Sequence, residues 1–562
     1  MRPPILPPLT PRAHLWILAA TAILLLLSGT ADLPLIDRDE PRFAQATREM
    51  MARHDWLVPT FNGEYRFDKP PLTYWAMALF YAVGGVSELA ARLHSIVSTV
   101  ALTLLIYAIG RRWFAAWAGF AAAFGFVTCL QVLLHGRLAV ADMPMVLAVA
   151  VAQFALFELL CGTEGDPAHA NFRSRRWFWT LYLALAAGFL AKGPIALAVP
   201  LGTALLHRFV FWRKPLPWGR LRIGRGLLLV LAIVGVWGIP GLIETHGLWW
   251  KVGMGEHVVA RGLEPLNSRH FFAPFYLVTA LFSLFPWIAL AGYGVVVVRR
   301  NWDERNAFLL SWLIAPYLIF LFYATQLPHY VLPAFPAFFL ILGQALGLKA
   351  PLPRWPRYIA WGILGFWAVV VLALTAVIVG APWLPPFASL RLALIGLATI
   401  LGGLVLLGVL FEIDRIPAMR GAVVLVAVGF LMLGTSLRPL EPAIRVAELA
   451  KGMPPETRFV AYGFTEGSLI FYTDRHWELE GAPVGSPAEM FGPGPEVVVQ
   501  LEQEIKIGSA LKWLWGRMLG RDPILQVDSS PAACPNTETP VEISGINFAR
   551  ASWETISVIV SR

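Results

Sequence analysis

Residues 359–379 read IAWGILGFWAVVVLALTAVIV and contain no charged side chain. A helix needs about 20 apolar residues to cross the hydrocarbon core of a bilayer, so this stretch predicts a transmembrane helix. Similar apolar stretches recur on both sides of it along the chain, and they lack the short alternating pattern of a transmembrane β-barrel. This recurrence predicts an all-α protein that crosses the membrane many times.

The overall composition supports the same fold class. The chain has 562 residues, of which 57% are hydrophobic and only 14% are charged, whereas about a quarter of the residues of a soluble protein are charged. A soluble enzyme, a disordered chain and a coiled coil are therefore excluded. The three cysteines, Cys129, Cys161 and Cys534, form neither a disulfide framework nor a spacing typical of a metal motif.

Dividing the apolar stretches into spans of helical length predicts about thirteen transmembrane helices. They are Leu15–Leu35, Ala90–Ile109, Ala115–Leu134, Met143–Leu160, Phe178–Leu190, Ile195–Phe211, Gly226–Ile243, Phe275–Val298, Ala307–Tyr323, Val331–Leu348, Ile359–Val379, Leu392–Phe411 and Ala422–Leu437.

The net charge of +9 reflects membrane topology rather than a nucleic-acid partner. The basic clusters fall in alternate connections, which places them on one side of the membrane, and the positive-inside rule makes that side cytoplasmic. The N-terminus is then cytoplasmic and the C-terminus lies outside; reading the first span as a signal peptide leaves the rest unchanged. The clusters are Arg111/Arg112, Arg173/Arg175/Arg176, Arg213 to Arg225, Arg299/Arg300, Lys349 to Arg357 and Arg415/Arg420.

The chain divides into a transmembrane domain, residues 1–437, and a small soluble α/β domain, residues 438–562. The transmembrane domain carries two large outer connections, residues 36–89 and 244–274. In the tail we expect helices over 445–451, 466–473 and 502–514 and strands over 458–462, 496–500 and 555–560, with no evident catalytic motif.

The first outer connection begins with acids and bases directly after an apolar span. Asp37, Asp39, Glu40 and Arg42 surround Pro41, which suits the first turn of a helix running to about Arg53. Such a cluster is suited to chemistry at the membrane surface. The structural alternative is that the acids favour the helix dipole and that Asp39 and Arg42 form an i,i+3 pair.

A second cluster in this connection is Phe67-Asp68-Lys69-Pro70-Pro71, followed by an apolar stretch, Leu72–Val83, short enough to lie along the membrane surface. Lys69 can hold a phosphate there. Alternatively, the prolines start a helix and Lys69 only extends toward the lipid headgroups.

Further polar residues fall in other connections of the outer face. The predicted topology brings all of them to one face of the bundle, which suits a substrate with a phosphate head and a lipid tail. Asp142 is also a plausible helix cap, and Glu256 and His257 are possible metal ligands. The set comprises Asp142, Lys192, Glu256, His257, Arg261, His329 and Tyr330.

Several stretches, in this order, resemble the GT-C membrane glycosyltransferases that use a polyprenyl-phosphate sugar, namely the superfamily of aminoarabinose (lipid A) transferases and protein O-mannosyltransferases. They are DRDEPRFAQATREM (37–50), GEYRFDKPPLTYW (63–75), AARLHSIVST (90–99), AVADMP (139–144), AKGPIALAVP (191–200), GEHVVARG (255–262), RHFFAPFYLV (269–278) and LPHYVLPAFPA (327–337).

The resemblance implies a role for each matching residue. At Asp68 the aminoarabinose transferases often have glutamate, and His329 follows the pattern of the broader superfamily. The implied roles are Asp39 and Glu40 in catalysis, Lys69, Arg42 and Arg261 on the donor phosphate, Asp142, Lys192, His329 and Tyr330 on the sugar and acceptor, and Asp68 and His257 as ligands of a divalent ion, zinc or magnesium.

The resemblance further implies a bacterial inner-membrane enzyme that moves a sugar from a polyprenyl-phosphate donor to lipid A or another envelope glycolipid at the periplasmic face, with inversion. The alternatives are protein O-mannosyl transfer, a transporter or flippase for a lipid-linked sugar, and a sensor that uses the tail as a binding module. The spans are nearly free of internal charge, which favours the enzyme over the transporter. The sugar and the acceptor remain open.

Overall fold

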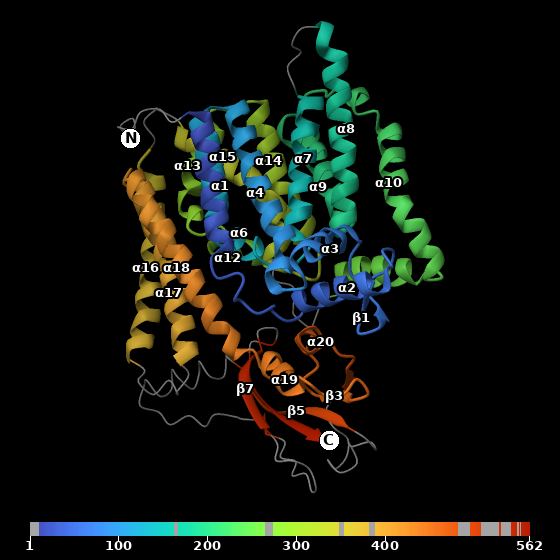
Figure 1. Cartoon of the computed structure of the whole chain (residues 1–562). Helices are drawn as coiled ribbons and strands as arrows, with labels where there is room; N and C mark the ends of the chain where they lie inside the picture. Colours follow the sequence, from blue (N-terminus) through green and yellow to red (C-terminus); the bar gives the residue numbers. More distant parts are fainter. Residues whose placement is uncertain are drawn as a thin grey trace.

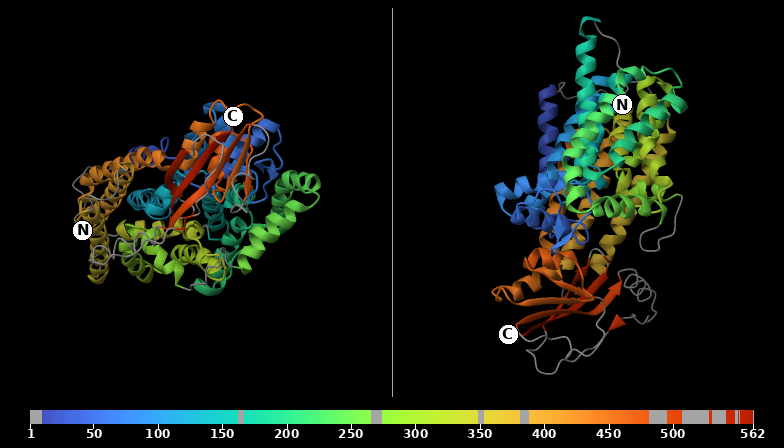
Figure 2. Two further views of the ribbon diagram at one scale, coloured as in Figure 1. Left: turned by 90° about the horizontal axis from the view of Figure 1, so that it is seen from below. Right: turned by 90° about the vertical axis from the view of Figure 1, so that its right-hand side faces the viewer.

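The computed structural model of the chain describes residues 10–161, 167–264, 274–347, 353–380, 388–480, 495–506, 528–529, 541–547, 550 and 552–561. A bundle of long helices forms the larger part, and a small domain with a mixed sheet lies below one end of it (Figures 1 and 2). We call this end the tail end of the bundle. The multi-pass architecture and the C-terminal α/β domain predicted from the sequence are confirmed.

Seven helices in the described part of the chain are long and apolar enough to cross a membrane. The other predicted spans coincide with shorter or more polar helices, so every predicted span falls on a helix or a pair of helices. The seven contain α4 (Glu88–Trp113), α7 (Asp142–Leu160), α10 (Ile223–Glu244), α15 (Phe335–Gly347), α16 (Trp355–Gly380), α17 (Ala388–Glu412) and α18 (Met419–Leu437), and the others are α1 (Pro11–Leu27), α5 (Ala116–Val127), α8 (Pro167–Lys192), α9 (Ile195–Leu206), α14 (Glu304–Leu321) and a bent pair of helices over 275–300.

Two predicted spans are interrupted, which corrects the expectation of continuous helices. The span 115–134 breaks into α5 and α6 (Leu130–His135), and the span 275–298 breaks into α12 (Phe275–Ser283) and a segment from η5 (Trp287–Leu290) to α13 (Ala291–Arg300), bent by 109°. Pro286 lacks an N–H and disfavours helical geometry in the preceding residue. The breaks compensate each other, because the Leu130 N–H donates to the Phe285 carbonyl at 2.9 Å.

Small residues bring α4 and α5 into close contact. A Cβ added at Gly110 of α4 would lie 2.6 Å from the Gly119 Cα of α5, and one added at Gly119 would meet α4 backbone at the same distance. No real Cβ tolerates this approach, so glycine at both positions lets the two backbones touch.

The first outer connection, residues 36–89, folds over the tail end of the bundle. It contains α2 (Glu40–Arg53), β1 (Thr60–Phe61), β2 (Glu64–Tyr65) and α3 (Leu72–Gly84), as expected for the helices. The turn between the strands is Asn62-Gly63, both with positive φ, which suits the twist of a two-residue hairpin. The Glu49 carboxylate accepts hydrogen bonds from the Asn62 N–H and the Thr60 hydroxyl, and so ties the hairpin to α2.

The second outer connection is a helical segment with wide turns. It contains η3 (Trp249–Ala260) and α11 (Arg261–Leu263), and residues 265–273 of the predicted connection lie outside the described residues. The Tyr323 hydroxyl donates to the Val258 carbonyl, and the Thr325 N–H donates to the Arg261 carbonyl. These bonds fix the last turns of η3 against the loop after α14.

In the described residues, the tail domain is a six-stranded mixed sheet with two helices, α19 (Pro442–Ala450) and α20 (Gly467–Thr473). The central strands run in the order β4-β3-β5-β8-β7, and β6 pairs with β5. Phe459, Ala461, Val497 and Val499 share one face of the sheet and form a core with the helices. The strands are β3 (Arg458–Tyr462), β4 (Glu478–Glu480), β5 (Glu496–Lys506), β6 (Asp528–Ser529), β7 (Val541–Asn547) and β8 (Ser552–Ser561).

One element of the tail was predicted wrongly. The helix expected over 502–514 is strand as far as Lys506, because β5 continues there and pairs antiparallel with β8 from Leu501/Ile556 to Lys506/Ser552. A long partner strand supplies a ladder of backbone hydrogen bonds that overrides the local helical pattern. Residues 507–514 lie outside the described residues.

The tail domain docks on the first outer connection through α20, which lies beneath α2 (Figure 1). Phe471 of α20 packs into the apolar cluster of this connection, and polar contacts join residues more than 400 positions apart in the sequence. The contacts are Leu35 N–H to the Tyr472 hydroxyl, Ser468 N–H and hydroxyl to the Asp37 carboxylate, the Arg48–Asp474 ion pair at 2.8 Å, and a reciprocal backbone and side-chain pair between Asn62 and Trp477.

Candidate active site

Glu40, predicted to act in catalysis, is sealed inside the protein. Only 2% of it is exposed. The Arg92 guanidinium from α4 donates two parallel hydrogen bonds of 2.8 Å to its carboxylate, and the Ala139 and Ile36 N–H groups donate two more. With its oxygens occupied in this way, Glu40 holds the start of α2 against the bundle, and we assign it a positioning role in place of the predicted catalytic one.

Asp39, the neighbouring acid, has the opposite surroundings. It lies at the N-cap position of α2 but makes no capping hydrogen bond, and its side chain is exposed. Its charge nevertheless acts on Lys69 and on Arg66, where it opposes the lowering of both pKa values by burial. Asp39 is therefore open to solvent and close enough to Lys69 and Arg66 for its charge to act on both.

Asp68 stands at the centre of this group. Its carboxylate pairs with Arg66 at 2.9 Å and with the His257 Nε2 at 2.9 Å, and the Arg261 guanidinium lies 3.9 Å away. Burial raises the pKa of Asp68, but the hydrogen bond from His257 and the charges of Arg66 and Lys69 outweigh it, so the pKa lies well below its ordinary value. Asp68 is thus a fixed negative charge beside two guanidinium groups and the His257 imidazole.

Lys69 is the candidate phosphate-binding cation. Its ammonium group donates to the Asp68 carbonyl at 2.9 Å and is partly buried. The pKa of Lys69 is lowered to about 8. Burial is the largest cause, the charges of Lys192 and Arg261 act in the same direction, and the charge of Asp68 opposes them. Two cations that repel Lys69 leave a site that favours an anion.

The residues predicted on the sugar and acceptor side also come together. Lys192, at the end of α8, forms an ion pair with Asp142, at the start of α7, and its ammonium lies 5.8 Å from the Tyr330 ring centroid. The His329 ring packs against that of His135, with centroids 4.9 Å apart. Asp142, Lys192, His329 and Tyr330 therefore share one location, although they come from three separate connections.

Arg42 borders a small cleft beside this cluster. The cleft has a volume of about 250 Å³ and is lined by Arg42, Phe61, Glu64, Tyr65, Arg66, Phe67, Asp68, Val252 and His257. The Arg42 guanidinium lies 5.9 Å from the Phe61 ring centroid, and its buried Nε has no hydrogen-bond partner among the described residues. Arg42 thus lies on the same wall of the cleft as Asp68 and His257.

Asp68 and His257 do not form a complete metal site. They bring one carboxylate and one imidazole together, but Arg66 occupies the second carboxylate oxygen. Zinc sites use three or four protein ligands, and no third histidine, cysteine or carboxylate joins these two within the described residues. The side chains described at this position are therefore too few to hold a resident zinc or magnesium ion by themselves.

Sequence analysis missed three residues that build this site. Arg66 is 8% exposed, pairs with Asp68 and donates to the Tyr74 hydroxyl at 3.1 Å. Arg92 fixes Glu40, and Glu49 fixes the hairpin. The only signal available was that all three lie inside the stretches that carry the family resemblance.

The sequence is similar to that of known membrane glycosyltransferases. Residues 68–237 match the family described as dolichyl-phosphate-mannose-protein mannosyltransferase. The undecaprenyl phosphate-alpha-4-amino-4-deoxy-L-arabinose arabinosyl transferases of Aeromonas hydrophila and Aeromonas salmonicida are 31% and 29% identical over 61% and 65% of this chain. The chain matches 62% and 66% of the length of these two relatives.

A solved structure is similar over nearly the whole chain. ArnT from Cupriavidus metallidurans bound to undecaprenyl phosphate superposes with a TM-score of 0.72 at 18% identity, covering 97% of both chains. Fold and site thus define a multi-pass membrane protein with the fold of that ArnT. Residues 68–237 match the mannosyltransferase family model and the relatives above are named as arabinosyl transferases, so the predicted resemblance to the membrane glycosyltransferases is confirmed.

Proposed function

We propose that the chain is a glycosyltransferase that moves a sugar from a polyprenyl-phosphate donor to lipid A or another envelope glycolipid. The observation that carries the proposal is the placement of one exposed carboxylate, Asp39, beside a group of cations whose charges repel one another, Lys69, Lys192 and Arg261. Relatives named as undecaprenyl phosphate-aminoarabinose transferases support the same substrate class.

The donor in such a reaction already has a phosphate as leaving group. As the bond between the sugar and the phosphate breaks, negative charge develops on the phosphate, and preorganised cations lower the barrier by stabilising it. Lys69 and Arg261 are placed for this, with Arg42 on the adjoining cleft wall. Asp68 acts indirectly, because its charge and hydrogen bonds hold Arg66, His257 and Arg261 in position.

Asp39 is placed to act on the acceptor. If the acceptor is a hydroxyl, the exposed Asp39 carboxylate removes its proton as it attacks the sugar. If the acceptor is a phosphate, no proton has to be removed, and Asp39 orients the acceptor or stabilises positive charge on the sugar. A single displacement inverts the anomeric centre in both cases. The Asp142–Lys192 pair and Tyr330 form the wall that contacts the sugar.

We infer that the chain lies in a bacterial inner membrane with the tail domain in the periplasm and the N-terminus in the cytoplasm. The basic clusters in alternate connections support this orientation. It places the cluster around Asp39 and Lys69 at the periplasmic surface, where a lipid-linked sugar presents its head.

A divalent ion has a place in this proposal only together with the donor. The chain supplies Asp68 and His257, so oxygens of the donor phosphate would have to complete the ligand set, as they do in many magnesium sites. Metal analysis of the purified protein with and without donor, compared with a His257→Ala variant, tests this. An ion that binds only with donor and is lost in the variant supports it.

Protein O-mannosyl transfer is the second candidate, because the matching family model is described by that activity. It uses the same donor class and differs in the acceptor. A flippase or transporter is disfavoured, since the charged cluster described above gathers at one end of the bundle.

The decisive experiment combines cells and purified protein. Mass spectrometry of lipid A, total glycolipids and glycopeptides, from cells with and without the protein, identifies the acceptor class by the mass that disappears. Purified protein is then incubated with undecaprenyl-phosphate sugars and either lipid A or a serine-rich peptide. Sugar on lipid A supports the leading proposal, sugar on the peptide supports the second candidate, and transfer to neither contradicts both.

A further inference from the structure

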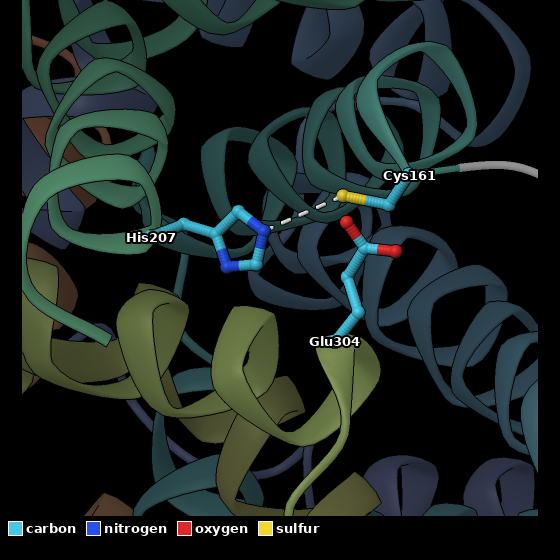
Figure 3. A group of neighbouring side chains, drawn as sticks. All are labelled: Cys161, His207 and Glu304. Carbon is cyan, nitrogen blue, oxygen red and sulfur yellow. Dashed lines mark hydrogen bonds between the residues drawn. The ribbon is translucent and has the colours of Figure 1, made fainter. Parts of the chain in front are cut away.

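Three side chains with metal-ligating atoms meet at the end of the bundle opposite the tail. Cys161 follows α7, Glu304 begins α14, and His207 begins η1 (His207–Phe211), a π-helical turn at the end of α9. Their ligand atoms all lie within 4.8 Å of one another (Figure 3). Asp142, at the other end of α7, belongs to the candidate active site, so this cluster is separated from it by the length of a 19-residue helix, about 28 Å.

The three groups converge on one point and do not form a catalytic relay. The Cys161 Sγ lies 3.5 Å from the His207 Nε2. In a thiol, imidazole and carboxylate triad, the acid binds the second ring nitrogen and orients the base. Here the Glu304 carboxylate faces the sulfur (Figure 3), and the buried Nδ1 of His207 has no hydrogen-bond partner among the described residues. This arrangement suits a ligand shared by all three groups.

The donor set selects the kind of ion. Magnesium and calcium prefer oxygen ligands, whereas a thiolate with an imidazole and a carboxylate suits zinc. Three protein ligands with one open position are typical of zinc sites that keep a water molecule. His207 is fully buried, and Cys161 and Glu304 are partly exposed.

We propose that Cys161, His207 and Glu304 bind a zinc ion that ties the ends of α7, α9 and α14 together. The His207 ring is already oriented, because the Phe308 ring packs edge-on against it at 5.6 Å and Trp212 stacks at 6.4 Å. Zinc–ligand distances of about 2.0–2.3 Å draw the three side chains inward and fix the π-helical turn. The proposal is independent of the transferase function, because the site lies far from Asp39 and Lys69.

The test uses the full-length protein, purified in detergent with an affinity tag free of histidine, and zinc alone as the probe. We expect about one zinc ion per chain by elemental analysis, retained in Cys129→Ser and in His257→Ala but lost in Cys161→Ser and in His207→Gln. Cys129 is the matched control because it is a buried cysteine whose Sγ donates to the Ser283 carbonyl at 2.9 Å, away from the cluster.

Cobalt replacement keeps the test decisive if a variant is unstable. Cobalt bound through a thiolate gives an ultraviolet charge-transfer band, which we expect in the wild type and in Cys129→Ser but not in Cys161→Ser. Zinc should also protect Cys161 from alkylation in the intact protein, read by mass spectrometry of its peptide. Wild-type protein that binds neither ion, or a cobalt–thiolate band that persists in Cys161→Ser, overturns the proposal.

Discussion

The tail end of the bundle has two layers of charge with opposite character, and Asp39 and Glu40, adjacent in the sequence, fall in different layers. The outer layer contains Asp39, Lys69 and Arg261, whose side chains are exposed or partly buried. The inner layer is the Glu40–Arg92 pair, with 2% and 0% exposure and every hydrogen bond made within the protein. Charge pairing in the inner layer holds the start of α2 against the bundle. Incomplete pairing in the outer layer leaves charged groups that can bind a substrate.

The largest expected effect is on Asp39, in the outer layer. Asp39→Asn removes the charge and keeps the shape, so we expect sugar transfer to fall by about 10³-fold, within the range for losing a general base. Because the side chain is exposed and caps nothing, folding and membrane insertion should not change. The measurement is turnover of a polyprenyl-phosphate sugar by purified protein, normalised to the folded fraction. Normal turnover would remove Asp39 from the reaction centre.

Substitution of Glu40 should lower stability and leave turnover largely unchanged, the reverse of the result expected for Asp39. Glu40→Gln leaves the Arg92 charge buried without its partner, and breaking such a pair costs about 3 kcal/mol or more of stability. We expect a lower thermal midpoint and poorer yield of monodisperse protein, while the folded fraction keeps turnover within a few-fold of wild type.

The double variant Glu40→Met with Arg92→Met is the matched control for Glu40. Removing both charges should recover much of the lost stability, because neither charge is then left unpaired. If Glu40→Gln folds normally but loses turnover, the division into an open catalytic layer and a closed structural layer is wrong.

This comparison also shows which features sequence can predict. The thirteen apolar stretches located the helices because helix length and apolar composition are local properties. The break at Pro286 depends on a second break near Leu130, which supplies the compensating hydrogen bond, and no local pattern reports that pairing.

The roles of charged residues were harder to predict than the helices. Asp39 and Glu40 look alike in sequence, and only the partner of Glu40, Arg92, separated by 52 positions, distinguishes them. The cluster of Cys161, His207 and Glu304 was invisible for the same reason, since three different helices bring its members together. By contrast, Asp142 and Lys192 were placed on one face correctly, because the topology alone determines it.

A smaller effect, on donor binding, is expected at Lys69 in the outer layer, whose pKa is lowered chiefly by burial. Lys69→Ala removes one charge-assisted hydrogen bond to the phosphate, so we expect donor affinity to fall by roughly 30-fold, about 2 kcal/mol. In the wild type, affinity should also weaken as pH rises through about 8, because the ammonium loses its proton there. The measurement is polyprenyl-phosphate binding between about pH 7 and pH 9.

Lys69→Arg provides the control, because a guanidinium stays charged throughout this range. It should keep more affinity than Lys69→Ala and remove the weakening above pH 8. Unchanged affinity in Lys69→Ala, or the same pH dependence in Lys69→Arg, would show that another group binds the phosphate.

The smallest effect concerns Asp37, where the tail domain meets the inner layer. Burial and the charge of Glu466 raise the pKa of Asp37 to about 7, while hydrogen bonds from Ser468 and the charge of Arg42 oppose this. The buried Glu441 carboxyl, whose pKa is also raised by burial and by Asp37, faces the same contact. The folded protein therefore binds a proton more tightly here than the unfolded chain, whose Asp37 keeps its ordinary pKa of 3.8.

Docking of the tail is consequently strongest below about pH 4 and weakens as pH rises toward 7, because the undocked Asp37 is then ionised and docking has to take up a proton. We expect hydrogen-exchange protection factors of α20 to fall several-fold over that range, and Asp37→Asn to reduce the slope. Asp474→Asn is the control: it breaks the exposed pair with Arg48 but leaves the Asp37 carboxyl in place, so it should lower protection without removing the slope. Protection that rises with pH, or an unchanged slope in Asp37→Asn, would mean that protonation of Asp37 does not control docking of the tail domain.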